Sequence, residues 1–302
     1  MASIFNFKKK KSEAELPNIV KGSENPLTMD DETFNKLKDV IYNSCGIYYG
    51  ESKKYLLESR ISKRIVSRNL TSFKEYIDLL RSHYGRQEIN QLFDVVTINE
   101  TYFFRAEQQF EAVEKIIIPE LVKLKNKEEN PVIKIWSAGC STGEEPYTLA
   151  LIILENLKFQ YPNVEFQIIA SDISNSVLET AERGNFKEYS IKNMPKEYLS
   201  KYFTHQGSTY QLNDEVKNMI QFENVNLYNS KEVKNITNCD IIFCCNVLIY
   251  FDVPSKQVVI SELFNSLNHN GYLFIGYSES LHGISKAFKL IHLPKSMTYK
   301  KE

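Results

Sequence analysis

A loop of small residues and an acid one strand later are the part of this sequence best suited to chemistry. The loop Ser137-Ala-Gly-Cys-Ser-Thr-Gly143 lies between a β-rich run and a helix, and Asp172 ends the next β-rich run. Small residues let a ligand approach the backbone, and ligands in open α/β sheets lie beyond the carboxyl ends of the strands. Asp172 could accept both hydroxyls of a ribose or cap the helix that follows it. Together the loop and the acid indicate a nucleoside ligand.

The loop does not have the pattern of a phosphate-binding loop. It matches neither G-x-G-x-x-G nor G-x-x-x-x-G-K-[ST]. Glu144 and Glu145 open the next helix, where they would repel a phosphate, and their other possible role is to complement the helix dipole. An adenosyl ligand without phosphates fits better than a dinucleotide, and S-adenosylmethionine is the common one. The residues alone therefore indicate an adenosyl-binding α/β enzyme.

Short β-rich runs alternate with helical stretches from residue 131 onward. The β-rich runs are Val132–Trp136, Phe166–Ala170, Asp240–Cys245 and Tyr272–Gly276. Helices are expected at Glu144–Leu157, Ser176–Arg183 and Pro254–Leu267. This alternation predicts a parallel α/β sheet. Residues 186–224 fit it poorly, and we expect there an inserted subdomain with a short antiparallel sheet around Thr209–Leu212 and Met219–Phe222.

The first third of the chain has helical periodicity and no strand signals. Leu57, Ile61 and Ile65 recur every four residues and predict one buried stripe. We expect a flexible tail over 1–28, an all-α domain over 29–112, a linker over 113–130 and the α/β domain over 131–302.

Composition sets limits on partners and metals. A hydrophobic fraction of 42% with 25% charged residues is typical of a globular protein, and a net charge of -1 gives no reason to expect nucleic acid. The five cysteines form no C-x-x-C pair, so we expect no metal and a reducing, cytoplasmic setting. No apolar run approaches the roughly 20 residues that span a bilayer, so no membrane insertion is expected. Nothing calls for more than a monomer.

Several longer strings resemble the CheR family of chemotaxis receptor methyltransferases. Asn99-Glu-Thr101-Tyr-Phe-Phe-Arg105 resembles its T-x-F-F-R motif, and Trp136 to Tyr147 resembles its cofactor loop. Further similar strings, in family order, are Ala170-Ser-Asp172-Ile, Asn226-Leu227, Phe243 to Phe251 and Gly276-Tyr-Ser-Glu279. The resemblance extends from about residue 31 to the C-terminus.

The resemblance implies a helical N-terminal domain, a Rossmann-like methyltransferase domain and an inserted antiparallel β-subdomain. It implies transfer of a methyl group from S-adenosylmethionine to glutamate side chains in the cytoplasmic methylation helices of chemotaxis receptors, at receptor arrays, without a metal and with S-adenosylhomocysteine as product. Arg105 and Tyr250 would lie nearest the methyl group. The residues expected to contact the cofactor are Asn99, Thr101, Arg105, Glu145, Asp172, Asn226, Leu227, Cys245 and Asn246.

One departure from the family concerns Cys245. The family usually has arginine at this place, in the string F-C-R-N, so a guanidinium beside the cofactor or the substrate carboxylate is missing. Cys245 could instead pack as a small buried group. Two alternatives follow: a regulatory module that binds S-adenosylmethionine with weak or no transferase activity, or a methyltransferase for a small molecule. The retained Arg105 and Tyr250 favour an enzyme, and the basic helical domain favours a protein partner.

Two surfaces could hold a receptor. Arg60, Lys63, Arg64 and Arg68 form a basic stripe that could steer an acidic helical bundle or simply face solvent. Some family members also grip a receptor's C-terminal peptide with a G-x-G turn in the β-subdomain. Here the stretch from His205 to Tyr210 has only Gly207. We therefore expect no tight peptide tethering, and micromolar binding in calorimetry would contradict this.

Overall fold

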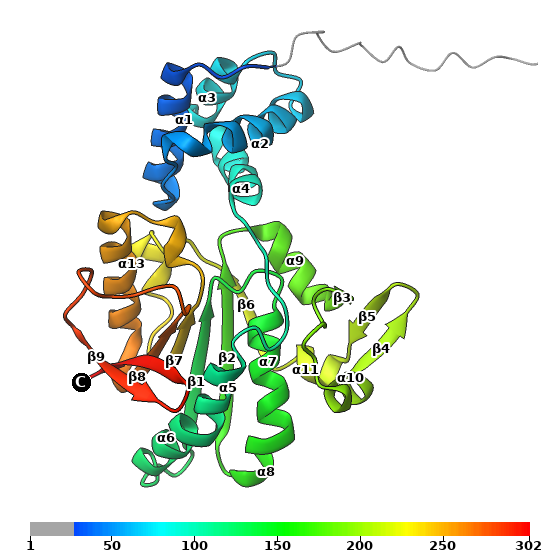
Figure 1. Cartoon of the computed structure of the whole chain (residues 1–302), viewed down its shortest axis with the longest axis vertical. Coiled ribbons are helices and arrows are strands. Elements are labelled where there is room, and N and C mark those ends of the chain that lie inside the picture. The colour runs from blue at the N-terminus through cyan, green and yellow to red at the C-terminus, as the bar shows by residue number, and fades with distance from the viewer. Residues whose placement is uncertain (1–26) are drawn as a thin grey trace, which may run out of the picture.

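A computed structural model describes residues 27–302, so the expected tail lies almost wholly outside the described residues. The N-terminal helices form one domain and pack their apolar stripes together (Figure 1). They are α1 (Asp31–Cys45), the 3-10 turn η1 (Glu51–Lys53), α2 (Lys54–Ser67), α3 (Phe73–Arg81) and α4 (Gly85–Val96). Leu57, Ile61 and Ile65 are fully buried in that core, as predicted. Gly46 ends α1 at φ +74°, the left-handed conformation that glycine favours.

A buried carboxylate joins three helices of this domain. Glu88 on α4 accepts hydrogen bonds from Arg64 Nε at 2.6 Å, from Arg64 Nη2 at 2.9 Å and from the Tyr76 hydroxyl at 2.9 Å. Arg68 Nε lies 3.3 Å from the same carboxylate, which is only 3% exposed. This forked pairing ties α2 and α3 to α4.

Replacing Glu88 with alanine is expected to destabilise the helical domain by about 2–4 kcal/mol, because it leaves the Arg64 guanidinium and the Tyr76 hydroxyl without their partner. Urea unfolding followed by circular dichroism measures this loss. Glu107→Ala, at an exposed position of the α/β domain, is the matched control. A loss below about 1 kcal/mol would show that the network contributes little.

The α/β domain is built on a seven-stranded sheet with the order β6-β2-β1-β7-β8-β10-β9. The first five strands in this order are parallel, and the last two are antiparallel to their neighbours. The strands are β1 (Val132–Ala138), β2 (Glu165–Asp172), β6 (Ile220–Asn224), β7 (Cys239–Cys244), β8 (Leu267–Ile275), β9 (Phe288–Leu293) and β10 (Ser296–Lys301). The predicted α/β class is therefore confirmed.

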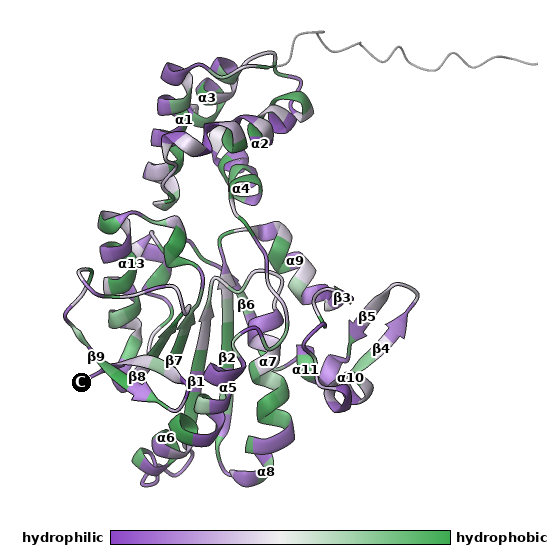
Figure 2. Cartoon of the chain, viewed as in Figure 1, coloured by the Kyte–Doolittle hydropathy of each residue, from purple (hydrophilic) through white to green (hydrophobic). Residues whose placement is uncertain are grey.

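Helices cover both faces of this sheet (Figure 1). Ile241 and Phe243 of β7 pack with α7 (Glu144–Ile152), while Ile242 packs on the other face with α13 (Val253–Ser266). Further helical segments of this domain are η3 (Ile153–Leu157), α8 (Lys158–Gln160), α9 (Asn175–Arg183) and α12 (Ser230–Val233). Figure 2 shows the central strands as largely hydrophobic. No helix in the described part of the chain has the length and apolarity needed to cross a membrane.

Residues 113–124, which the sequence analysis places in a linker, are helical instead. They form the π-helical turn η2 (Val113–Ile117) and α6 (Ile118–Leu124), which continue α5 (Glu107–Ala112). Their apolar side chains belong to the core of the sheet, so this helix is part of the α/β domain. The helical N-terminal domain accordingly ends with α4 at Val96 and not at residue 112.

The inserted subdomain contains a three-stranded antiparallel sheet with the order β3-β5-β4. Its elements are β3 (Asn185–Lys187), α10 (Lys196–Tyr202), β4 (Phe203–Gln206), β5 (Thr209–Leu212) and α11 (Asp214–Lys217). The predicted strand at Thr209–Leu212 is confirmed. The strand expected at Met219–Phe222 was assigned to the wrong sheet, because β6 pairs in parallel with β2 as an edge strand of the main sheet. Gly207 lies in the turn between β4 and β5.

Candidate active site

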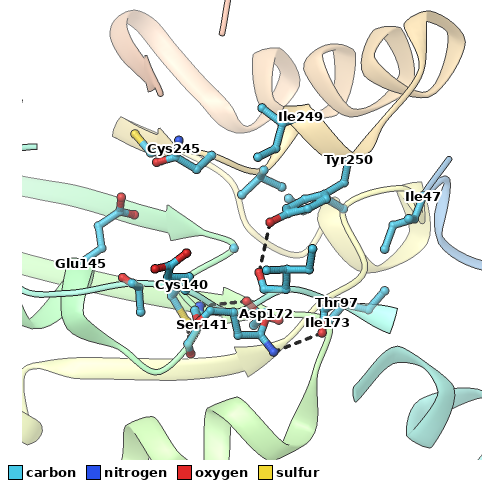
Figure 3. Close-up of a pocket in the computed structure, with 18 of the residues that line it drawn as sticks. Ile47, Thr97, Cys140, Ser141, Glu145, Asp172, Ile173, Cys245, Ile249 and Tyr250 are labelled. Atoms are coloured by element: carbon cyan, nitrogen blue, oxygen red, sulfur yellow. Dashed lines mark hydrogen bonds between the residues drawn. The ribbon is translucent and has the colours of Figure 1, made fainter. Parts of the chain in front are cut away.

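A cavity of about 250 Å³ opens where the strand ends meet the helical domain (Figure 3). Cys45, Ile47 and Thr97 line it from the helical side. All ten residues proposed for the cofactor or the methyl group line the same cavity: Asn99, Thr101, Arg105, Glu145, Asp172, Asn226, Leu227, Cys245, Asn246 and Tyr250. Glu145 and Ile47 lie at opposite ends of the view. The structure thus gathers residues from widely separated motifs into one site.

Asp172 is held rigidly at the end of β2. Its Oδ2 accepts the Ser141 amide at 2.9 Å, and its Oδ1 accepts the Ser174 amide at 3.0 Å. Burial raises the pKa of this carboxyl, and the amide hydrogen bonds oppose the rise. Ser174 caps α9, because its hydroxyl accepts the Val177 amide, so the capping role suggested for Asp172 is wrong. Asp172 instead fixes the loops at Ser141 and Ser174 and lines the cavity.

Glu145 is a carboxyl with little compensation for its burial. Burial raises its pKa to about 7, although a hydrogen bond from the Ser137 hydroxyl at 2.7 Å and the charge of Arg105 lower it. A cation placed beside Glu145 would restore its ordinary ionisation. This end of the cavity is thus suited to a positively charged ligand group.

Arg105 lies in the connection between α4 and α5, Tyr250 lies in the loop after β7, and both residues line the cavity. Arg105 Nη1 donates to the Glu100 carbonyl at 2.7 Å, and the side chain remains exposed. The Tyr250 hydroxyl donates to the Ile98 carbonyl at 3.2 Å. Burial raises the pKa of Tyr250, so its hydroxyl is protonated at neutral pH and can donate a hydrogen bond.

The side chains of Asn226 and Asn99 have partners within the protein. Asn226 Nδ2 donates to the Ser44 carbonyl at 2.7 Å, and its Oδ1 accepts the Tyr228 amide at 3.1 Å. Asn99 Nδ2 donates to the Thr97 hydroxyl at 3.2 Å. Asn226 therefore links the loop after β6 to the C-terminal end of α1, in addition to lining the cavity. Cofactor contact by these amides remains a prediction.

Cys245 lies in the wall of the cavity and not in the core alone. Its thiol donates to Gln109 Oε1 at 3.5 Å, and Gln109 Nε2 donates to the Ile275 carbonyl at 2.7 Å. Burial raises the pKa of the Cys245 thiol well above its ordinary value, so the group is neutral. At the place where the family usually has a guanidinium, this chain therefore presents a small neutral group.

No role was predicted for Glu279, which lies beside the cavity, or for the helical-domain residues Cys45 and Ile47 in the cavity wall. Glu279 lies within the motif Gly276-Tyr-Ser-Glu279, which supplied a family match but no role. Its carboxylate accepts backbone amides of the loop after β7. Cys45 and Ile47 gave no signal, because nothing in their local pattern shows that α1 ends beside the strand-end loops.

The structure does not present the basic stripe as four free cations. Arg60, Lys63 and Arg64 lie on α2, and Arg68 is its C-cap residue. Arg64 is committed to Glu88, and Arg60 donates to the carbonyls of Val96 at 2.8 Å and Thr97 at 3.3 Å. Arg68 is half-exposed and also approaches Glu88. The Lys63 side chain is exposed and has no hydrogen bond or ion pair among residues 27–302. Lys63 and Arg68 are therefore the available part of the stripe.

Three features lie at the carboxyl ends of the parallel strands. They are the loop of small residues 137–143, the acid Asp172, which is placed to accept ribose hydroxyls, and the buried acid Glu145, which suits a cation. This combination is suited to an adenosyl ligand that carries a positive charge, such as S-adenosylmethionine. Residues 99–297 match the family described as CheR methyltransferase, SAM binding domain, and residues 32–97 match its all-alpha domain. The chain belongs to the CheR methyltransferase family.

Curated relatives agree with this assignment. Chemotaxis protein methyltransferase 2 of Vibrio cholerae serotype O1 is 36% identical over 278 residues, which are 92% of this chain and 95% of that protein. Chemotaxis protein methyltransferase of Borreliella burgdorferi is 36% identical over 258 residues, which are 85% of this chain and 91% of that protein. The solved magnesium protoporphyrin IX methyltransferase of Synechocystis PCC 6803 is 15% identical, with a TM-score of 0.33, and covers 74% of this chain and 94% of its own. The family assignment does not depend on that slight likeness.

Proposed function

We propose that this protein transfers a methyl group from S-adenosylmethionine to glutamate side chains in the cytoplasmic methylation helices of chemotaxis receptors, at receptor arrays. S-adenosylhomocysteine is the product. The observation that carries the proposal is the convergence of Arg105 and Tyr250 on the cavity that Glu145 and Asp172 also line. The resemblance to receptor methyltransferases supplies the substrate.

The cavity fits the proposed cofactor. Glu145, whose pKa is raised by burial, would hold the ammonium group, and Asp172 would hold the ribose hydroxyls. The backbone of Gly139 and Ser141 lines the cavity, where small residues admit close approach. When bound, S-adenosylmethionine supplies an electrophilic methyl group on a sulfonium.

The protein's part in the reaction is positioning. A glutamate side chain with a reference pKa of about 4.3 is already ionised at neutral pH, so no general base is needed. The planar guanidinium of Arg105 can orient that carboxylate. The Tyr250 hydroxyl, which has a single O–H, can donate to the other oxygen in place of the Ile98 carbonyl. Alignment of this kind is worth roughly 7–11 kcal/mol in well-oriented cases.

The direct test is to incubate the protein with radiolabelled S-adenosylmethionine and membranes that contain chemoreceptors. Base-labile label on receptor glutamates supports the proposal. Cofactor binding without transfer supports the second candidate, a regulatory module, which the neutral Cys245 in the cavity wall favours. Label on a small molecule but not on the receptor would contradict both.

The raised pKa of Glu145 predicts a pH dependence of cofactor affinity. The carboxyl must be ionised to hold an ammonium, and with a pKa of about 7 it is mostly neutral at pH 6. Affinity is therefore expected to rise about five- to tenfold from pH 6 to pH 7.5, a range below the ordinary α-amino pKa of about 7.7–8.0. Binding should also release protons near pH 7.

Isothermal calorimetry in buffers of different ionisation enthalpy measures both effects. Glu145→Gln should bind more weakly at pH 7.5 and show a nearly flat pH profile. Glu179→Gln, an exposed substitution on α9, should retain the wild-type profile. A wild-type affinity that is constant across this pH range would contradict the role of Glu145.

Receptor docking is expected to depend on Lys63 and Arg68. The double variant Lys63→Glu, Arg68→Gln removes the available charges of the stripe and leaves the Arg64–Glu88 pair in place. Methylation of receptor in membranes should slow by about tenfold at low salt, with a weaker salt dependence. Lys158→Glu, on α8 at the far end of the sheet, is the control (Figure 1). Unchanged rates across salt concentrations would exclude docking by this face.

A further inference from the structure

Glu279 lies where two strand-end loops meet beside the cavity. Its Oε2 accepts the backbone N–H of Asn246 at 2.9 Å and that of Gly276 at 2.6 Å. Its Oε1 accepts the backbone N–H of Ile249 at 3.1 Å. One carboxylate therefore joins the end of β8 to the loop after β7, and these charge-assisted hydrogen bonds are of the strong class.

The loop held in this way carries two of the proposed site residues. Asn246 is in the left-handed conformation at φ +61°, which is uncommon for residues other than glycine. Ile249 is the middle residue of the 3-10 turn η4 (Leu248–Tyr250), and Tyr250 is its last residue. A turn this short has little stability of its own. Fixed acceptors for its amides therefore decide where Asn246 and Tyr250 lie.

Gly276 shows how closely the two loops approach each other. A Cβ atom built at this glycine would lie 2.8 Å from Glu279 Oε2 and 2.9 Å from Asn246 Nδ2. Any residue with a Cβ atom at this position would require one of the two loops to shift, and only glycine leaves room for both groups. The contact between the loops is thus tight, and Glu279 fills its centre.

Within residues 27–302, these three amides have no other side-chain acceptor. Tyr250 in turn reaches the helical domain, because its hydroxyl donates to the Ile98 carbonyl and its own carbonyl accepts the Tyr48 amide at 2.9 Å. Loss of the Glu279 bonds would therefore change the loop at the point where it faces the substrate.

We infer that Glu279 is a positioning residue, which acts through the backbone of the 246–250 loop to place Asn246 toward the cofactor and Tyr250 toward the substrate carboxylate. For methyl transfer this inference rests on the proposed function. It assigns a role to a carboxylate that would not touch the reacting atoms. Its effect on cofactor affinity, through Asn246, does not depend on which substrate is methylated.

The test uses Glu279→Gln and Glu279→Asp in the full chain, with Glu179→Gln as the matched exposed control. In Glu279→Gln, one carbonyl oxygen replaces two carboxylate oxygens as acceptor for the three backbone N–H groups, and the NH₂ group faces at least one of these donors. In Glu279→Asp, the charge is kept, but the shorter side chain does not extend far enough to accept all three hydrogen bonds. We expect the Kd for S-adenosylmethionine, measured by calorimetry, to rise about tenfold in both variants. The kcat for receptor methylation should fall about 10- to 100-fold. The unfolding temperature should stay close to that of the wild type.

A double-mutant cycle with Tyr250→Phe separates positioning from general damage. If Glu279 acts through Tyr250, adding Glu279→Gln to Tyr250→Phe should lower kcat by less than about a third of its effect on the wild type. Effects that multiply independently, or Kd and kcat values within about twofold of wild type in both variants, would overturn the inference. If the wild type transfers no methyl group to receptors, the proposed function fails, and the binding measurements alone decide the role of Glu279.

Discussion

Replacing Arg105 with alanine is expected to lower receptor methylation by about 10²- to 10³-fold, the usual cost of removing a preorganised donor from an active site. Arg105 lines the cavity, and among residues 27–302 its guanidinium has one hydrogen bond, to the Glu100 carbonyl. Because the side chain is exposed, the free energy of unfolding should hardly change. The measurement is the initial rate of base-labile labelling of receptors at saturating cofactor.

Arg105→Lys sharpens this test, because lysine keeps the charge and loses the planar fork. We expect it to recover only part of the rate. Arg183→Ala is the control, since Arg183 is exposed on α9 and donates to the Thr180 hydroxyl at 3.0 Å, away from the cavity. Full activity in Arg105→Ala would show that Arg105 neither orients the substrate nor supports the cofactor.

Replacing Asp172 with alanine is expected to weaken S-adenosylmethionine binding by about 100-fold, because two charge-assisted hydrogen bonds to the ribose would be lost. The same change removes the acceptor of the Ser141 and Ser174 amides, so the loop after β1 would lose its fixed position. Calorimetry gives the Kd directly and needs no receptor.

Asp78→Asn, an exposed substitution on α3, serves as the control for Asp172→Ala. Hydrogen exchange at the Ser141 amide distinguishes loop disorder from loss of ribose contact. A Kd within about threefold of wild type would contradict the assignment of Asp172 to the ribose.

Local periodicity was sufficient to predict the class of each domain. The stripe of Leu57, Ile61 and Ile65 is buried as expected, and strands alternate with helices after residue 131. Site residues gather for a related reason: parallel strands place their carboxyl ends on one edge, so motifs that follow different strands must meet there. The longer motifs then narrowed the prediction from an adenosyl-binding α/β enzyme to the CheR family.

The wrong predictions concern segments whose packing partners are distant in the sequence. Met219–Phe222 was correctly predicted as a strand, but the sequence of a short apolar strand does not indicate which sheet it joins. Residues 113–124 continue α5 through a π-helical turn and pack on the sheet, and their local pattern did not indicate these contacts. Element type was predicted for Met219–Phe222 but not for residues 113–124, and the spatial neighbours were predicted for neither.

Charged residues show the same limit. The spacing of the basic stripe correctly places three cations on α2 and the fourth at its C-cap, but Arg64 pairs with Glu88, which is 24 residues away. Glu279 escaped assignment because it acts on backbone amides, which leave no pattern in side-chain types. Sequence therefore predicts which residues can do chemistry better than it predicts which residues hold them in place.

The strand order of the sheet also determines when, during synthesis, the cofactor can first bind. The early strands β1 and β2 pair with each other, but β1 must wait for β7, which begins about 100 residues after β1 at Cys239. Until then the unfinished domain exposes an unpaired, apolar strand edge that can associate with other chains. The helical domain contains mostly local contacts and can fold earlier. If Asn246 holds the cofactor as proposed, S-adenosylmethionine can stabilise the chain only after that residue has left the ribosome and β7 has paired with β1.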